Sequence, residues 1–221
     1  MFGSTNRGQI VTDAVLRIRK TMYSDVDQIV SVHRGAFSGF YLDRMGPAFL
    51  RVYYECALAN AGVISLVAVQ ESGAIEGFVV GFKSPKLFYT EFKSVKSRLF
   101  LPMILAILRR PSLLIPSVAN VFKVDKDSTT ESDGTYTELV SIGVTGNGKG
   151  MGSQLLRKFI EVAYLSEVNE IRLTTNRDDN DSVNQFYLKH GFQTMGIEYR
   201  NKRALNKYSL EISDVRFEEK T

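Results

Sequence analysis

The chain has 221 residues, of which 44% are hydrophobic and 24% charged, with a formal net charge of +4. This composition is ordinary for a globular protein and excludes wholesale disorder. The longest apolar stretch near the middle, 99–108, is far shorter than the ~20 residues of a membrane-spanning helix. We expect no secretory signal, because the N-terminus lacks an apolar segment.

Cys56 is the only cysteine. Neither an intramolecular disulfide nor a cysteine-based zinc cluster is therefore expected. The length suggests one large domain or one domain with an insertion, and the cytoplasm is the default compartment.

The N-terminal region predicts a flexible end followed by a strand and a helix. Residues 1–14 are polar, whereas 15–19 alternate apolar and basic residues as a strand does. Ser24 is the predicted N-cap of the first helix. That helix would bury one face, formed by Val26, Ile29, Val30 and His33.

The next segments predict a loop, a second helix and a hairpin. The loop covers 35–41, and the helix runs from Gly46–Pro47 to Gly62. Strands are predicted over 63–69 and 75–82, joined by a turn with Ser72–Gly73 at its centre.

Charge is concentrated in one segment. Residues 83–123 carry eight Lys or Arg and one Glu, a net +7, so the rest of the chain sums to −3. Apolar residues recur there at helical spacing, and we expect a basic helical insertion over about 84–125. Such a segment can face nucleic acid, an anionic membrane or a phosphorylated substrate. A helical pair with a solvated basic face is the interpretation that the sequence favours.

The C-terminal part alternates strands and helices after a polar loop at 125–134. Strands are predicted over 136–145, 170–175, 192–200 and 205–212, and helices over 152–166 and 181–190. The pattern predicts a mixed α+β domain in which helices pack on one sheet.

Residues 143–152 read GVTGNGKGMG, and four interpretations compete for them. A P-loop fits poorly because Gly150 follows Lys149 where a hydroxyl residue should bind Mg²⁺. The dinucleotide pattern fails because Ser153 replaces its third glycine. A structural turn would not need four glycines. The fourth interpretation is a loop that wraps a pyrophosphate with backbone amides at a helix N-terminus.

Two motifs together resemble the GNAT superfamily of acetyl-CoA-dependent N-acetyltransferases. The family's loop pattern, Gln/Arg-x-x-Gly-x-Gly/Ala, falls on NGKGMG at 147–152. Its downstream pattern, Asn-x-x-Ala-x-x-x-Tyr, falls on Asn180, Val183 and Tyr187. Asn147 departs from the pattern, and the loop is about two residues shorter than usual and lacks proline. These departures imply weaker cofactor contacts or a compensating role for Lys149.

The resemblance implies a fold and a domain organisation. A twisted, mostly antiparallel sheet flanked by helices would form a single acyltransferase domain over 15–212, interrupted by the basic helical insertion. Residues 213–221 would be a C-terminal tail.

The resemblance also implies an acetyl-CoA site and no metal. The backbone of Ile142, Gly143 and Val144 would pair with the pantetheine arm, and Asn180 would touch that arm. Tyr187 would sit near the thioester sulfur and protonate the leaving thiolate. The pyrophosphate would be held by the loop and helix start, namely Asn147, Gly148, Lys149, Gly150, Met151, Gly152 and Ser153.

Glu138 falls where several family members keep a general base. We expect Tyr136, Glu138, Val140, Ile142 and Val144 to share one strand face, which would partly desolvate the carboxylate and raise its pKa. The alternative is a glutamate that reaches solvent or pairs with a basic residue. For Tyr187 the alternative is a core tyrosine, and His33 is expected to be a satisfied packing histidine.

The acceptor cleft would be walled by the loop after the first helix. Phe37, Phe40 and Tyr41 would supply apolar surface, and Asp43 could meet a cation; packing within the loop is the alternative. The stretch AFSGFYLDRMGPAFLRVYY and the basic insertion are similar to a bacterial GNAT subgroup linked with surface-polysaccharide synthesis. That analogy implies an amino-sugar acceptor, nucleotide- or lipid-linked.

Three functions stay open at this stage. The first is an N-acetyltransferase of a small amine, without a nucleic-acid partner. The second is an acetyltransferase of protein or antibiotic amines. The third is a non-catalytic acyl-CoA-binding or membrane-surface module, with 84–125 touching the inner face of the membrane. The oligomeric state is also open, a dimer included.

Overall fold

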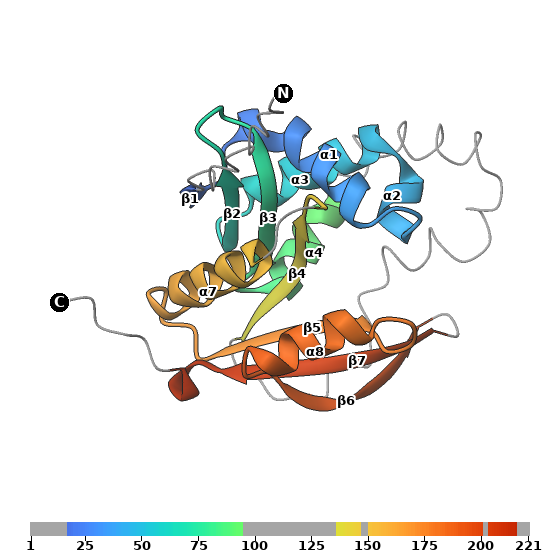
Figure 1. The fold of residues 1–221 in the computed structure, drawn as a ribbon, viewed down its shortest axis with the longest axis vertical. Coiled ribbons are helices and arrows are strands. Elements are labelled where there is room, and N and C mark those ends of the chain that lie inside the picture. Colours follow the sequence, from blue (N-terminus) through green and yellow to red (C-terminus); the bar gives the residue numbers. More distant parts are fainter. Residues whose placement is uncertain (1–16, 95–135, 147–149, 201–202, 216–221) are drawn as a thin grey trace, which may run out of the picture.

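The computed structural model describes residues 17–94, 136–146, 150–200 and 203–215 (Figure 1). The predicted flexible end at 1–14, the polar loop at 125–134, most of the basic insertion and the end of the tail lie outside the described residues. The elements before the insertion are β1 Arg17–Lys20, η1 Tyr23–Asp25, α1 Val26–Ala36, α2 Tyr41–Met45, α3 Pro47–Ala59, β2 Val63–Val69, β3 Ile75–Phe82 and α4 Pro85–Ser94. Those after it are β4 Tyr136–Val144, α7 Met151–Tyr164, β5 Glu170–Asn176, α8 Asp181–Lys189, β6 Gln193–Arg200, β7 Arg203–Glu211 and η4 Ile212–Asp214.

Seven strands form one sheet in the order β1-β2-β3-β4-β5-β7-β6. Neighbouring strands pair antiparallel except β4 and β5, which are parallel. The predicted mixed α+β class and mostly antiparallel sheet are therefore confirmed. The parallel pair follows from the chain path, because α7 carries the chain back from the end of β4 to the start of β5.

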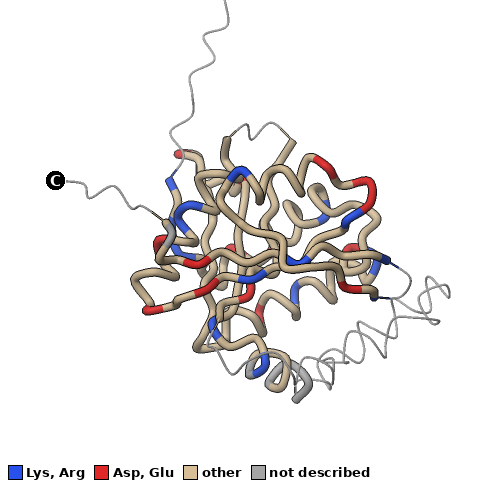
Figure 2. The backbone as a smooth tube through the Cα atoms, turned by 90° about the horizontal axis from the view of Figure 1, so that it is seen from below, with Lys and Arg blue, Asp and Glu red and all other residues tan. Residues whose placement is uncertain are grey.

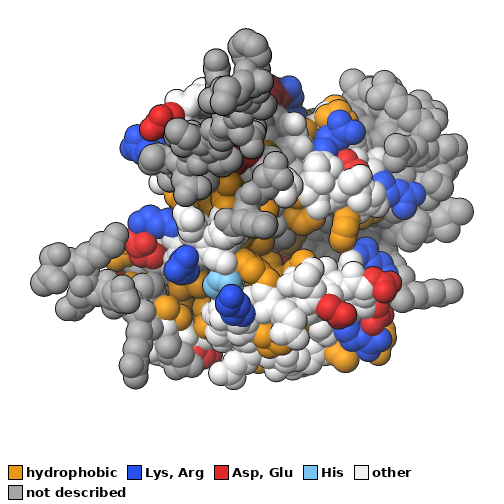
Figure 3. Space-filling model, viewed as in Figure 1, with side chains coloured by type: hydrophobic (Ala, Val, Ile, Leu, Met, Phe, Trp, Pro, Cys, Tyr) orange, Lys and Arg blue, Asp and Glu red, His pale blue; other side chains and the backbone are white. Residues whose placement is uncertain are grey.

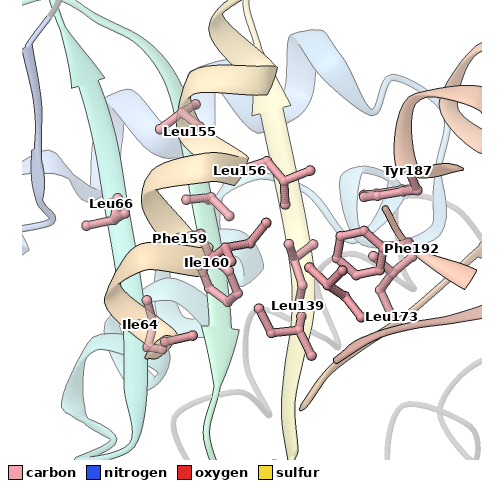
Figure 4. Close-up of a cluster of buried hydrophobic side chains, with 14 of the residues drawn as sticks. Ile64, Leu66, Leu139, Leu155, Leu156, Phe159, Ile160, Leu173, Tyr187 and Phe192 are labelled. Carbon is pink, nitrogen blue, oxygen red and sulfur yellow. The ribbon is translucent and has the colours of Figure 1, made fainter. Parts of the chain in front are cut away.

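Helices cover both faces of the sheet. On one face, α1 and α3 pack on alternate residues of β2 and β3, including Val67 and Phe78. On the other face, α7 packs on the intervening residues, and Tyr187 of α8 joins the same cluster (Figure 4). The side chains of a strand alternate between its two faces, so each buried strand supplies both cores.

Most predicted elements are confirmed to within two residues, and two features near the N-terminus differ. Ser24 does not cap α1; a 3-10 turn, Tyr23–Asp25, precedes the helix. The carboxylate of Asp25 accepts hydrogen bonds from the Met22 amide at 2.7 Å and from both terminal nitrogens of Arg19. A buried ion pair with β1 thus fixes how the chain enters α1.

The loop expected at 35–41 was also partly wrong. Helix α1 continues to Ala36, and the short helix α2 begins at Tyr41. Gly46, with φ of 89°, ends α2, and Pro47 begins α3. Glycine adopts this conformation without strain, and proline suits the first turn of a helix.

The strands β4 and β5 separate soon after they begin. Their parallel pairing covers Tyr136–Glu138 and Glu170–Arg172 in the described structure. Beyond those residues β4 continues to Val144 and β5 to Asn176, and the two strands diverge (Figure 1). The sheet therefore has an upper half, β1 to β4, and a lower half, β5 to β7. The two halves are joined by the short pairing of β4 with β5, which ends at Glu138.

Candidate active site

A β-bulge in β4 changes which side chains face which layer. The register with β3 shifts so that Val80 pairs with Ser141 and Gly81 with Leu139, which leaves Val140 between them. Val140 packs with the α1/α3 core, whereas Ile142 and Val144 pack with the α7 core. The predicted common face of five β4 residues is therefore wrong, because one extra residue reverses the alternation that follows it.

Glu138 lies at the point where the two halves of the sheet separate. It pairs with Phe82 on β3 and forms the last parallel pair with Arg172 on β5. Burial among the surrounding side chains raises its pKa to about 7. A carboxyl group with this pKa can take up a proton near neutral pH, which is what a general base has to do.

Two groups partly offset the effect of burial on Glu138. The charge of Arg200 and a hydrogen bond from the Tyr89 hydroxyl lower the pKa of this carboxyl, whereas Glu198 raises it. Tyr53 belongs to the same cluster, because burial and the charge of Glu138 raise the pKa of its phenol. The cluster joins α3, α4, β4 and the end of β6.

Tyr187 lies on the other side of the sheet from Glu138. It is 5% exposed and packs in the α7 core, with ring contacts to Phe186, Phe192 and Tyr208. Burial raises the pKa of its phenol, so the hydroxyl keeps its proton across the physiological range. The expected core packing is therefore present, together with a protonated hydroxyl that suits an acid.

The upper part of β4 presents one unpaired edge within the described structure. Residues 139–144 pair with β3 on one side, while pairing with β5 ends at Glu138. Ile142, Gly143 and Val144, the residues predicted to bind pantetheine, lie on this stretch. Backbone groups along such an edge are suited to bind an extended amide chain. Figure 3 shows hydrophobic side chains on the surface between the upper and lower halves of the molecule.

The N-terminus of α7 follows directly from this edge. Gly150 is the N-cap, with φ of 82°, and Met151, Gly152 and Ser153 form the first turn. Their amides have no partner within the helix and favour an anion. Asn147, Gly148 and Lys149 lie outside the described residues.

Asn180 caps α8 and points its amide group back to β5. Its Nδ2 donates to Thr175 Oγ1 at 3.0 Å and to the Asn176 carbonyl at 2.9 Å. This side chain therefore holds the turn between β5 and α8. Its predicted contact with CoA remains a prediction.

The residues predicted to line the acceptor cleft differ in their exposure and contacts. Phe37 and Tyr41 are partly buried against the α1/α3 core, whereas Phe40 is 45% exposed. Asp43 accepts hydrogen bonds from the Gly39 amide at 2.9 Å and from Arg34 at 3.2 Å. The cation that Asp43 contacts is therefore Arg34, in the last turn of α1.

Phe37 also lies close to the upper end of β4. A Cβ atom built on Gly143 would lie 3.1 Å from its ring. Glycine at this position lets α1 approach the upper end of β4 closely. The loop after α1 and the unpaired edge of β4 thus lie in one region of the molecule.

The sequence analysis missed the role of Tyr89, Tyr53 and Arg200 around Glu138. The sequence predicts that Tyr89 lies in the basic insertion and that Arg200 ends a strand. It does not predict that either residue lies near Glu138. The available signal was the helical recurrence of apolar residues from Phe88 onward, which predicts a helix but not the residues that it contacts.

Among the described residues, no group of three or more His, Cys, Asp or Glu side chains is placed to hold a metal ion. None of the helices in the described part of the chain has the length and hydropathy needed to cross a membrane.

No protein-family model matches the chain, and the comparison with curated proteins found no match. Solved structures do match. One from Desulfovibrio desulfuricans, assigned to the GNAT family of acetyltransferases, has a TM-score of 0.59 at 14% identity and covers 90% of this chain and 99% of its own. The ribosomal-protein-S18-alanine N-acetyltransferase of Escherichia coli has a TM-score of 0.57 at 11% identity, with 92% and 100% covered.

A third match carries a ligand. The PaiA N-acetyltransferase of Thermoplasma acidophilum, in complex with coenzyme A, has a TM-score of 0.51 at 15% identity, with 87% and 98% covered. These similarities show that the chain has the fold of the GNAT acetyltransferases. The resemblance to the polysaccharide-linked subgroup stays a prediction.

Proposed function

We propose that this protein is an acetyl-CoA-dependent N-acetyltransferase that acts on a primary amine. The observation that carries the proposal is the position of Glu138. A carboxyl group with a pKa of about 7 lies at the residue where β4 and β5 separate. An acyl donor along the open edge of β4 would bring its thioester close to this carboxylate.

The donor site would combine three described features. The open edge of Ile142–Val144 would pair with the amides of the pantetheine arm. The first turn of α7, after Gly150, would bind the pyrophosphate through its backbone amides and its dipole. Asn147, Gly148 and Lys149 would complete the loop, and Asn180 would close the site beside the arm.

The reaction needs one base and one acid. Glu138 would take a proton from the acceptor ammonium, directly or through a water molecule, and the free amine would attack the carbonyl carbon of the thioester. A carbon–nitrogen bond forms as the carbon–sulfur bond breaks. Tyr187 would give its proton to the departing thiolate. The attacking nitrogen would lose its second proton to solvent as the amide forms, and the Tyr187 phenolate would regain a proton from solvent.

An amino sugar is the acceptor class that we favour. The cationic side chains described near Glu138 are balanced by acids: Arg172 forms a two-pronged ion pair with Glu170, and Arg200 pairs with Glu198. Acidic and basic residues are also interspersed along the described backbone (Figure 2). A polycationic acceptor would need an excess of acid, whereas a small amine with a single charge does not.

The first test is calorimetric titration with acetyl-CoA, with CoA and Mg-ATP as comparisons. We expect saturable binding of acetyl-CoA and none of ATP. Turnover is then measured on an amino sugar, its nucleotide-linked form, a peptide with a free N-terminus and spermidine. Acetyl-CoA binding without turnover on any acceptor would favour a binding module, and preference for the peptide would indicate a protein acceptor.

The second test is Glu138→Gln. Loss of the base should lower kcat by roughly 100-fold or more at neutral pH while leaving acetyl-CoA binding intact. Glu71→Gln, in the exposed β2–β3 turn, is the matched control. Wild-type activity should rise through pH 7 as Glu138 ionises. An unchanged kcat in Glu138→Gln would remove this residue from the mechanism.

A further inference from the structure

The side-chain amide of Asn184 joins three elements in the lower half of the sheet. Asn184 lies on α8 and is 8% exposed. Its Nδ2 donates hydrogen bonds to the carbonyl oxygens of Asn176, at the end of β5, and of Arg177, each at 3.2 Å. Its Oδ1 accepts from Asn206 Nδ2 at 3.1 Å and from the Tyr208 hydroxyl at 3.0 Å, both on β7. A carboxamide offers two donor hydrogens and an oxygen that accepts two bonds, so this one is fully used.

The amide fastens α8 to a part of β5 that has left β4. Within the described structure, pairing with β4 ends at Arg172, and β5 continues beside β7 alone. At the end of this stretch the Asn176 carbonyl accepts hydrogen bonds from both Asn180, at 2.9 Å, and Asn184. Asn180 begins α8 and Asn184 lies one turn later. The two amides therefore set how α8 lies on this half of the sheet.

The position of Tyr187 depends on the same helix and on its aromatic neighbours. Tyr187 lies three residues after Asn184, on the next turn of α8. Its ring lies beside Phe192, with centroids 5.6 Å apart, and it contacts the ring of Tyr208 at 6.1 Å (Figure 4). A movement of α8 or of these rings would therefore carry the Tyr187 hydroxyl with it.

Tyr208 connects the amide of Asn184 to the ring of Tyr187. Its hydroxyl donates to Asn184 Oδ1 and also accepts from Asn206 Nδ2 at 3.3 Å, while its ring packs against Tyr187. Hydrogen bonds at one end of this side chain and ring packing along it restrict its orientation. Asn184 thus acts on Tyr187 by two routes, through the backbone of α8 and through Tyr208.

We propose that Asn184 is a positioning residue of the acyl-donor site, whose amide holds α8 and Tyr208 so that the Tyr187 hydroxyl can reach the departing thiolate. Asn184 does not touch the reacting atoms. The catalytic meaning of this network rests on the proposed function, whereas the hydrogen bonds do not. A proton donor has to lie within hydrogen-bond reach of its acceptor, and a displacement of about 1 Å can lower a rate roughly 100-fold.

The test is a double-mutant cycle on kcat. Asn184→Leu removes all four hydrogen bonds and keeps a side chain of similar size, and it is made both in the wild type and in Tyr187→Phe. We expect Asn184→Leu to lower kcat by roughly tenfold or more in the wild type and by less than about twofold in Tyr187→Phe, because a displaced acid matters only where the acid is present. An equal loss in both backgrounds, or no loss in the wild type, would overturn the positioning role.

Asn60→Leu is the matched control. Asn60 is 5% exposed at the end of α3, and its Oδ1 accepts a hydrogen bond from the Gly62 amide at 2.9 Å. It should lower the thermal midpoint as Asn184→Leu does, yet leave kcat within about twofold of the wild type. A loss of kcat in Asn60→Leu equal to that in Asn184→Leu would show that general destabilisation is responsible.

Tyr208→Phe is the milder variant that decides the question if Asn184→Leu does not fold. It removes one hydrogen bond to Asn184 and keeps the ring against Tyr187. We expect it to lower kcat by about twofold to tenfold in the wild type, and by less in Tyr187→Phe. A Tyr208→Phe protein whose kcat falls equally in both backgrounds, or not at all, would contradict the proposal.

Fluorine-19 NMR separates this inference from the proposed function. The protein is labelled with 3-fluorotyrosine, and the Tyr187 signal is identified as the one missing from Tyr187→Phe. This signal should shift or broaden in Asn184→Leu and stay in place in Asn60→Leu. An unmoved signal in Asn184→Leu would refute the positioning role even in an inactive protein. A moved signal, together with a wild type that transfers no acetyl group, would refute the proposed function and leave the structural link between Asn184 and Tyr187 established.

Discussion

The Nδ1 atom of His33 lies 2.7 Å from the hydroxyl oxygen of Tyr54, inside the α1/α3 core. His33 is 2% exposed, and its Nε2 is buried without a hydrogen-bond partner. The side chain of Ser141, next to the bulge in β4, partly offsets the effect of burial, which raises the pKa of the Tyr54 phenol. The predicted packing histidine is therefore only half satisfied, because one ring nitrogen contacts Tyr54 and the other has no partner among the described residues.

The burial of His33 makes the stability of the fold sensitive to pH. Burial lowers the pKa of His33 from 6.5 to about 4. Between these values the unfolded chain binds a proton that the folded protein does not, so stability falls as the pH drops from 6.5 towards 4. The effect has an upper bound of roughly 3 kcal/mol. Urea unfolding from pH 7 to pH 4.5 should show it in the wild type.

His33→Gln should flatten that pH dependence, whereas His190→Gln, at the only other histidine, should keep it. Glu138 acts in the opposite sense, because its raised pKa makes the folded state bind more protons between pH 4.5 and 7. The comparison is therefore made between variants and not on the wild type alone. Equal slopes in both histidine variants would refute the assignment.

Gly81 of β3 allows α7 to lie close to the sheet beside Glu138. A Cβ atom at this position would stand 2.5 Å from both the Glu138 carbonyl oxygen and the Phe159 ring. Gly81→Ala should lower the free energy of unfolding by about 1–3 kcal/mol, since neither neighbour can yield easily. It should also reduce kcat by displacing β4 at Glu138.

Gly35→Ala is the control for that change. Its Cβ would meet nothing within 4 Å, and Gly35 lies in helix α1. Alanine there should leave stability unchanged or raise it by up to about 1 kcal/mol. Chemical denaturation of both variants measures the difference, and a Gly81→Ala protein as stable as Gly35→Ala would contradict the packing argument.

Gly150 tests the proposed pyrophosphate site. It holds a left-handed conformation, φ of 82°, directly before α7. Alanine costs about 1–2 kcal/mol in this conformation, so Gly150→Ala should displace the first turn of α7 and weaken acetyl-CoA binding by roughly tenfold. Calorimetric titration measures the change.

Gly73→Ala carries the same strain, with φ of 85°, in the β2–β3 turn. It should lower stability to a similar extent and leave the dissociation constant for acetyl-CoA unaltered. Comparable losses of affinity in both variants would mean that global destabilisation, and not the helix start, is responsible.

Local patterns predicted much of this architecture. Both strands of the β2–β3 hairpin begin and end at the predicted residues, because short-range alternation and a Ser-Gly turn determine a hairpin. Met151, Leu155, Phe159 and Ile160 recur at the spacing of one helix face, and all four are buried. The order of strands and helices needed no long-range information.

The sequence by itself determined the elements, the glycine-rich turn before α7 and the carboxylate on β4, since each depends on residues close together in the chain. Only the tertiary structure decided the reversal of faces after Val140, which depends on pairing with β3. It also decided that Tyr89, Arg200 and Glu138 meet. These residues are far apart in the sequence, and the pKa of a buried carboxyl is set by every element packed around it.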